Sequence, residues 1–162
     1  MNQQVLEAKQ NVVKEIVECY KNSQTIIFVQ YRGLSVAQLQ EIRRALRAEN
    51  ASLCVYKNSL VERAMDEVGQ AEAKELLTGP NAVVFSEDVS AGAKVAAKYA
   101  KRLKDVFVIK GGVVEGKFAD AEKMLEVSKL PNKEGLISMF LSCLQAPVRQ
   151  FACAIQAVAD AK

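Results

Sequence analysis

The sequence predicts an α+β fold of the ferredoxin-like type: a split βαβ sandwich of helices and a four-stranded sheet, followed by a C-terminal amphipathic helix. A strand–helix–strand pattern occurs twice, which is the repeat of this topology. The two units open with residues 26–29 and 82–85, which are unbroken apolar runs typical of central strands buried on both faces. Pro131, followed by apolar residues at helical spacing, separates the last helix from the sandwich.

A helix and the first strand–helix–strand unit fill the N-terminal third of the chain. The apolar spacing predicts a helix over residues 3–21. Its inward face comprises Val12, Val13, Ile16, Val17 and Tyr20. The first unit then consists of a strand over 25–31, a helix over 36–49 and a strand over 52–57.

The helix of the first unit has a marked beginning. Ser35 is followed three residues later by Gln38, the spacing of a capping box in which each side chain bonds to a backbone N–H group. The apolar stripe comprises Val36, Leu39, Ile42 and Leu46. Arg43 and Arg47 lie one turn apart and away from that stripe, where a solvated polar face is the default interpretation.

The second unit repeats the pattern with a strand over 82–86, a helix over 91–103 and a strand over 106–113. Ser90 precedes this helix and is its expected N-cap. Gly111-Gly112 in the last strand predicts a bulge or a bend at a sheet edge.

Shorter elements complete the predicted domain. Two short helices, about 59–68 and 71–77, connect the units, and a third is expected around 119–126. A linker marked by proline follows, because proline disfavours helix at the residue before it. The chain is therefore predicted to divide into a domain at 1–130 and a linker with the C-terminal helix at 131–162.

The C-terminal region carries two apolar stripes, and Pro147 between them predicts a kink or a restart of the helix. The first stripe comprises Leu136, Ile137, Phe140, Leu141 and Leu144. The second comprises Val148, Phe151, Ile155 and Val158. We expect this helix to bind apolar grooves on partner proteins. The alternatives are a helix folded back on its own domain and a helix on a membrane surface, which the scarcity of basic residues disfavours.

Composition limits the classes of site. The 162 residues carry a net charge of +3, with four cysteines and no histidine. A Cys/His zinc site is therefore excluded and a four-Cys site is disfavoured, so we expect no metal and no cofactor. No apolar run approaches the ~20 residues of a membrane span and the N-terminus is polar. We expect a cytoplasmic protein with reduced, half-buried thiols.

Two basic elbows follow the strands of the first unit. Arg32-Gly33 comes after the strand at 25–31, Lys57-Asn58 stands at the end of the strand at 52–57, and a helix begins after each. Helix N-termini offer free N–H groups and partial positive charge, which suit phosphate. The elbows therefore predict a surface that grips a nucleic-acid backbone. An ordinary glycine turn and an asparagine N-cap beside a solvated lysine are the alternatives.

Four runs of the sequence resemble the family of the bacterial large-subunit ribosomal protein L10, the anchor of the acidic ribosomal stalk. They are YRGLSVAQLQEIRRALR, VYKNSLVERA, LLTGPNAVVFSED and LQAPVRQFACAIQAVADAK. The motifs at 31–34 and 57–60 are specific in this order and spacing. Asn50 stands where the family usually has glycine, but asparagine tolerates the left-handed conformation, so the turn should be kept.

The resemblance implies a division of tasks on the ribosome. The domain at 1–130 would bind large-subunit ribosomal RNA next to another stalk-base ribosomal protein. The C-terminal helix, Leu136 to Ala161, would hold dimers of the acidic stalk protein, two if each apolar block holds one, and these dimers recruit translational GTPases. Carried over by position, the RNA contacts would be Arg32, Gly33, Lys57 and Asn58, with Arg63, Arg43 and Arg47 as neighbours.

Two other classes of function remain at this point. An enzyme is disfavoured because no histidine is available as a base and no nucleophile–base pair is suggested by spacing. A generic RNA-binding translational regulator would need aromatic residues on an open sheet face for base stacking. Phe28 and Phe85 belong to apolar runs, so we interpret them as core.

Overall fold

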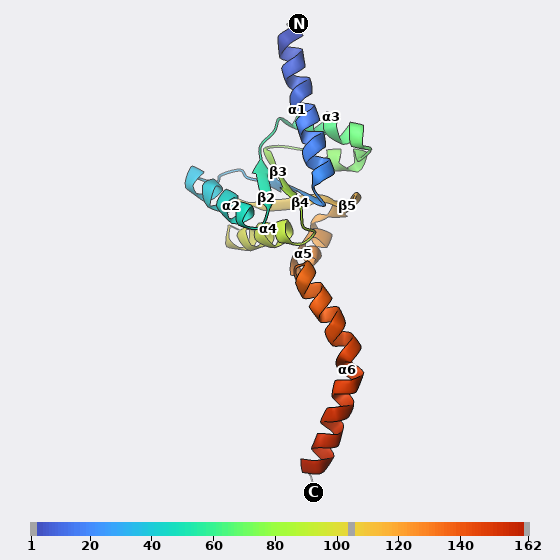
Figure 1. The fold of residues 1–162 in the computed structure, drawn as a ribbon. Coiled ribbons are helices and arrows are strands. Elements are labelled where there is room, and N and C mark those ends of the chain that lie inside the picture. Colours follow the sequence, from blue (N-terminus) through green and yellow to red (C-terminus); the bar gives the residue numbers. More distant parts are fainter. Residues whose placement is uncertain (1–2, 104–105, 161–162) are drawn as a thin grey trace. The chain divides into compact units, whose positions relative to one another are not determined.

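The structure is a computed structural model that describes residues 3–103 and 106–160. The chain divides into two compact units, Met1–Leu130 and Pro131–Lys162. The first unit holds a sheet with its helices, and the second holds one long helix (Figure 1).

The sheet has five strands, and all neighbouring strands run antiparallel. They are β1 (Thr25–Gln30), β2 (Ala51–Cys54), β3 (Asn81–Ser86), β4 (Val108–Val114) and β5 (Lys117–Asp120). Their order is β2-β3-β1-β4-β5, so β1 and β3 occupy the central positions predicted from their apolar runs. The α+β ferredoxin-like class is therefore confirmed.

The fifth strand is an addition to the four that the sequence predicted. Val114 pairs with Lys117, and the two residues between them, Glu115 and Gly116, both have positive φ, 49° and 77°. Two residues with positive φ form the turn that suits a two-residue hairpin loop. The prediction missed β5 because its four residues are too few to show a strand pattern, and it extended a helix into them instead. That helix, α5 (Ala121–Lys129), begins only after β5.

The expected bulge lies in β4 at Lys110, next to the glycine pair. Phe28 faces Gly111 and Val29 faces Ile109, so one residue of β4 has no partner on β1. A Cβ atom on Gly112 would lie 2.1 Å from the carbonyl oxygen of Ile26, which no side chain allows. The predicted location at a sheet edge is wrong, because β5 covers that side of β4.

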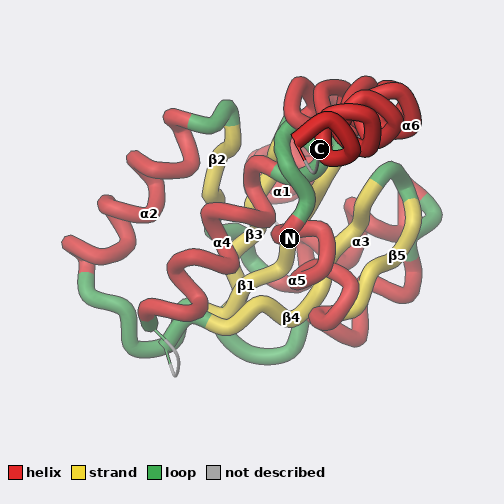
Figure 2. Tube along the Cα trace, turned by 90° about the horizontal axis from the view of Figure 1, so that it is seen from below, coloured by secondary structure: helices red, strands yellow, loops and turns green. Residues whose placement is uncertain are grey.

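Helices cover both faces of the sheet (Figure 1). One face carries α1 (Gln3–Asn22), α3 (Asn58–Val68) and the 3-10 helix η1 (Ala71–Leu76), and the other carries α2 (Val36–Ala48), α4 (Ala91–Arg102) and α5. The first five of these helical segments in chain order begin and end within one residue of their predicted bounds. Figures 1 and 2 show α2 and α4 side by side on their face of the sheet.

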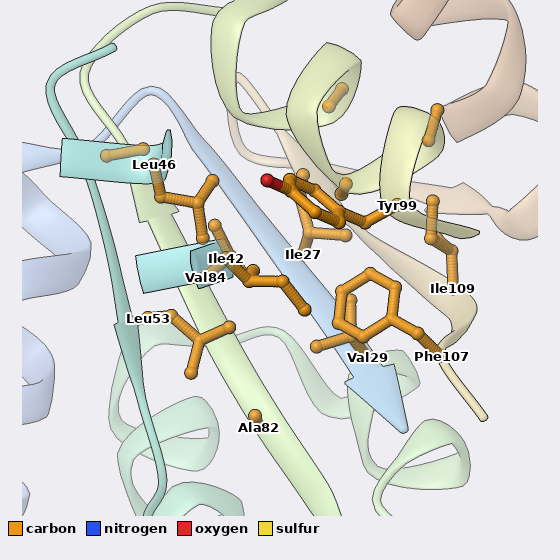
Figure 3. Packing of buried hydrophobic residues seen from close by; sticks show 14 of the residues in the cluster. Ile27, Val29, Ile42, Leu46, Leu53, Ala82, Val84, Tyr99, Phe107 and Ile109 are labelled. Carbon is orange, nitrogen blue, oxygen red and sulfur yellow. The ribbon is translucent and has the colours of Figure 1, made fainter. Parts of the chain in front are cut away.

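The strand β1 contributes side chains to both layers of the core, one on each face of the sheet. Ile26 and Phe28 are buried under α1 and α3, whereas Ile27 and Val29 are buried under α2 and α4. Figure 3 shows the second of these layers, where the ring of Phe107 lies beside Val29. Both faces of the central strands are therefore shielded from water. This explains why the sequences of these strands are continuous apolar runs and do not alternate between apolar and polar residues.

The second unit contains the helix α6 (Lys133–Asp160), with Pro147 inside it. Of the two outcomes predicted at this proline, a kink or a restart, the helix shows the kink and continues through Pro147 (Figure 1). A proline removes only one backbone donor and displaces one preceding turn, which a long helix tolerates by bending. Figure 1 shows a change of direction near the middle of α6.

Candidate nucleic-acid interface and partner-binding helix

The two basic elbows lie at the same edge of the sheet. Both β1 and β2 run antiparallel to β3, so their C-terminal ends point the same way. The first elbow, Arg32-Gly33, follows β1, and the second, Lys57-Asn58, follows β2. The beginning of β3 separates them, because β3 lies between β1 and β2 in the sheet.

The first elbow needs its glycine for backbone conformation. Gly33 has φ +92°, and a Cβ atom placed there would lie 3.5 Å from Cγ1 of Val106. That distance is an ordinary van der Waals contact, so a Cβ atom would not be excluded by lack of space. The positive φ is what favours glycine at this position. The next turn begins with the predicted capping box: the N–H of Gln38 donates to Oγ of Ser35, and the N–H of Ser35 donates to Oε1 of Gln38.

The second elbow is built differently from the asparagine N-cap considered above. Lys57 occupies the N-cap of α3, and its side chain makes no capping hydrogen bond. Asn58 instead donates from Nδ2 to the carbonyl oxygens of Leu77 and Gly79, at 2.7 and 2.8 Å. Its amide therefore fixes the loop that leads into β3, and the first N–H groups of α3 stay uncapped.

A half-buried lysine, Lys110, also holds this loop. Nζ of Lys110 on β4 donates to the carbonyl oxygens of Leu76 and Thr78. Burial lowers the pKa of this amine below its ordinary value. Lys110 and Asn58 thus bond to alternate carbonyl groups of the loop from Leu76 to Gly79, which leads into β3.

A groove of about 750 Å³ lies between α1 and α3 beside the second elbow. It brings together two predicted RNA contacts, Lys57 and Arg63, and two lysines of α1, Lys9 and Lys14, that the sequence analysis did not select. The other lining residues are Gln10, Val13, Ser59, Leu60 and Glu67. The sequence did contain a sign that these two lysines lie near another element. On the helix α1 they are neighbours of Val13, which is buried against the sheet, so both border the packed face of that helix.

The α2 arginines do not join this groove. Arg47 comes twelve residues after Ser35, so the helical rise places it roughly 18 Å along α2 from the first elbow. It lines a separate hollow of about 350 Å³ with Ser52 and Ser86, at the opposite edge of the sheet. Arg43 lies between these ends and is half-buried. The seven predicted RNA-contact residues therefore do not form one continuous patch.

The predicted partner-binding residues form one exposed stripe along α6. Exposed fractions run from 42% at Leu136 to 73% at Val148. The stripe includes Leu136, Ile137, Phe140, Leu141, Leu144, Val148, Phe151 and Ile155; the side chain of Val158 lies outside the described part. Met139, which the prediction omitted, is also exposed. Residues 136, 140, 144, 148, 151 and 155 follow one another at spacings of three or four, so the two predicted blocks join across Pro147 into one stripe.

The thiols are arranged differently from the expectation. Cys19 and Cys54 are half-buried, but Cys143 and Cys153 are exposed on α6, and all four are free. Among the residues that the structure describes, no group of three metal-ligating side chains comes together. Over the same residues, no helix has the length and apolar character needed to cross a bilayer.

Comparison with known proteins covers both units. The family model "Ribosomal protein L10" matches residues 4–101, and the model "Ribosomal protein uL10 C-terminal region" matches residues 130–162. Proteins named "Large ribosomal subunit protein uL10" from Bacillus cereus (strains B4264 and AH187) and Bacillus anthracis (strain CDC 684) are 48% identical over 159 residues. The match covers 98% of this chain and 95% of each relative.

Proposed function

Because the chain belongs to the ribosomal protein L10 family, we propose that it connects large-subunit ribosomal RNA to the acidic proteins of the ribosomal stalk. As a member of this family it is a non-enzymatic protein of the large ribosomal subunit and serves translation. The observation that carries the proposal is the contrast between its units: one has a basic edge on a closed core, and the other is a helix with an exposed apolar stripe.

The domain at 1–130 is the RNA-binding half of the proposal. Arg32, Lys57 and Arg63 have exposed side chains around one edge of the sheet, where ribosomal RNA would contact them next to the neighbouring stalk-base protein. Gly33 would allow close approach of the backbone, and Asn58 would hold the loop beneath Lys57. Arg43 and Arg47 would contact RNA only if the RNA extends along α2, because these two residues lie farther along that helix from this edge.

The helix α6 is the partner-binding half. Its stripe would bind apolar grooves on dimers of the acidic stalk protein, one dimer on each side of Pro147, and so two in all. Burying large apolar side chains contributes roughly 1.5–3 kcal/mol each, and eight described residues of the stripe are exposed. Through these dimers the protein would recruit translational GTPases indirectly.

Truncation after Asn132 tests the division of tasks. The shortened protein should lose all binding to the acidic stalk protein, because the stripe is removed, and should keep the affinity of the full chain for large-subunit ribosomal RNA. Native mass spectrometry of the full chain with the acidic protein should show two dimers per copy. Loss of both RNA and protein binding on truncation would contradict the proposal.

Substitution at the first elbow tests the RNA surface. Arg32→Ala should weaken binding and reduce the slope of log affinity against log salt concentration by roughly one unit, because one phosphate contact is lost. Arg47→Ala removes the same charge at the opposite edge and should change the slope less. An unchanged slope for Arg32→Ala would remove this residue from the interface.

A further inference from the structure

The groove between α1 and α3 concentrates positive charge from two segments that are far apart in the sequence. Lys9 and Lys14 come from α1, Lys57 from the second elbow, and Arg63 from α3. All four side chains are exposed. Glu67 is the single acidic residue among the nine that line the groove, so the lining carries a net charge of +3.

Within the part of the chain that the structure describes, no ion pair neutralises these four cations. Of the ion pairs formed among the described residues, Lys74 with Asp66 and Arg102 with Glu41, neither involves a residue of the groove. Four like charges around one hollow repel one another, and a bound anion would relieve that repulsion. The lining is therefore organised for a negatively charged ligand.

The uncapped beginning of α3 adds backbone donors at the same place. The N–H groups of Asn58 and Ser59 have no acceptor among the described residues, and Ser59 lines the groove. Free N–H groups at a helix N-terminus bind phosphate oxygens well. Backbone donors and cationic side chains thus point to the same ligand chemistry.

The lining does not suit a small organic ligand. Such sites are lined mostly by apolar and aromatic side chains, whereas Val13 and Leu60 are the two apolar residues of this groove and it has no aromatic one. A phosphodiester backbone needs several cations spaced along a channel instead. Lys57 of the second elbow lines the groove, so the groove adjoins the edge at which the RNA surface is proposed.

We propose that the α1–α3 groove holds a stretch of RNA backbone, with Lys9 and Lys14 binding phosphates from one wall and Lys57 and Arg63 from the other. This inference rests on the proposed function and extends it, because it adds α1 to the RNA-binding surface. It also assigns Glu67 an opposing effect, since its carboxylate lies in a groove that receives phosphates.

The experiment compares paired charge removals in the full-length chain. Lys9→Gln/Lys14→Gln removes two charges from the groove wall, and Lys98→Gln/Lys101→Gln removes two exposed charges from α4, on the other face of the sheet. Binding to large-subunit ribosomal RNA transcribed in vitro is measured from about 50 to 300 mM salt. The groove pair should weaken binding roughly tenfold and reduce the salt slope by about two units, and the α4 pair should change neither.

A substitution of opposite sign gives a second measurement. Glu67→Gln removes the one carboxylate of the groove and should strengthen RNA binding, because its repulsion of phosphate is lost. Equal behaviour of the groove pair and the α4 pair, or an unchanged affinity for Glu67→Gln, would overturn the groove assignment. Failure of the unmodified chain to bind this RNA would instead overturn the proposed function, so the two failures are distinct.

Discussion

Asn58 shows how a residue can take a role that its local sequence does not reveal. Lys57-Asn58 before a helix suggests capping, but the amide of Asn58 bonds to carbonyl groups 19 and 21 residues away. Those partners come close only when α3 packs beside the loop before β3. By contrast, Asn50 was predicted to take the left-handed conformation from its place in a turn, and its φ is 51°.

Substitution of Asn58 should separate bracing from direct RNA contact. Asn58→Ala should lower the free energy of unfolding by about 1–2 kcal/mol, because two carbonyl groups lose their donor. Asn58→Asp should lower it further, since a carboxylate cannot donate to carbonyl oxygens. Urea denaturation followed by circular dichroism measures both values. Unchanged stability with weakened RNA binding would show direct contact instead of bracing.

Tyr56 should make the protein less stable in alkaline solution. Burial raises the pKa of Tyr56 above its ordinary value of 10.0, and a hydrogen bond with Cys54 and the charge of Glu15 raise it further. Because the pKa is higher in the folded state, the phenol of the unfolded chain ionises first as pH rises above about 10. The contribution of Tyr56 to the free energy of unfolding is therefore complete below about pH 10 and is lost as pH rises through the folded-state pKa. Urea denaturation between pH 9 and 12 should show this fall.

The Tyr56→Phe variant isolates this effect, because it removes the hydroxyl and leaves the ring. Its free energy of unfolding should fall less above pH 10 than that of the unmodified protein. Below pH 9 the difference between the two proteins should stay constant with pH. Parallel curves over the whole range would contradict the assignment to Tyr56.

At the scale of elements, segments with a clear apolar pattern were predictable, and the strand β5 was not. The helices α1, α2 and α4 follow from their apolar spacing because each buries one stripe against the sheet. The strand β5 has four residues, of which Ala119 alone is buried. Its pairing depends on the turn at Glu115-Gly116, which a search for apolar patterns does not detect.

The continuity of α6 through Pro147 can be measured directly. Pro147→Ala restores a backbone donor and removes a ring that crowds the preceding turn, and proline in a helix interior costs about 3 kcal/mol relative to alanine. Amide hydrogen exchange of the residues around Cys143 to Phe151 should therefore slow clearly. Ser142→Ala, a change in the same helix without a backbone effect, should slow it only slightly. Equal exchange in the two variants would contradict this account.

At the scale of the whole molecule, the sequence was sufficient for the order of the four predicted strands and for the identity of the exposed stripe, but not for the groove. Strand order follows from two apolar runs and a known topology. The groove depends on how α1 and α3 pack over the sheet, which brings residues near position 10 to residues near position 60. No local pattern encodes that approach.

The exposed stripe of α6 should make the free protein bind apolar dyes. Fluorescence of anilinonaphthalene sulfonate should rise with the full chain, because large contiguous apolar surface is unusual on a soluble monomer. It should fall on truncation after Asn132 and also on addition of the acidic stalk protein. Equal fluorescence with and without α6 would show that the stripe is already covered in the free chain.

The position of α6 after the domain has a consequence for how the protein is made. During synthesis all five strands of the sheet are translated before the apolar stripe of α6, so they leave the exit tunnel first. The exposed stripe therefore leaves the ribosome after the strands that form the core, and under the proposed function the acidic stalk protein would then cover it. A cell that produces too little of that partner would accumulate copies open to chaperones and proteases.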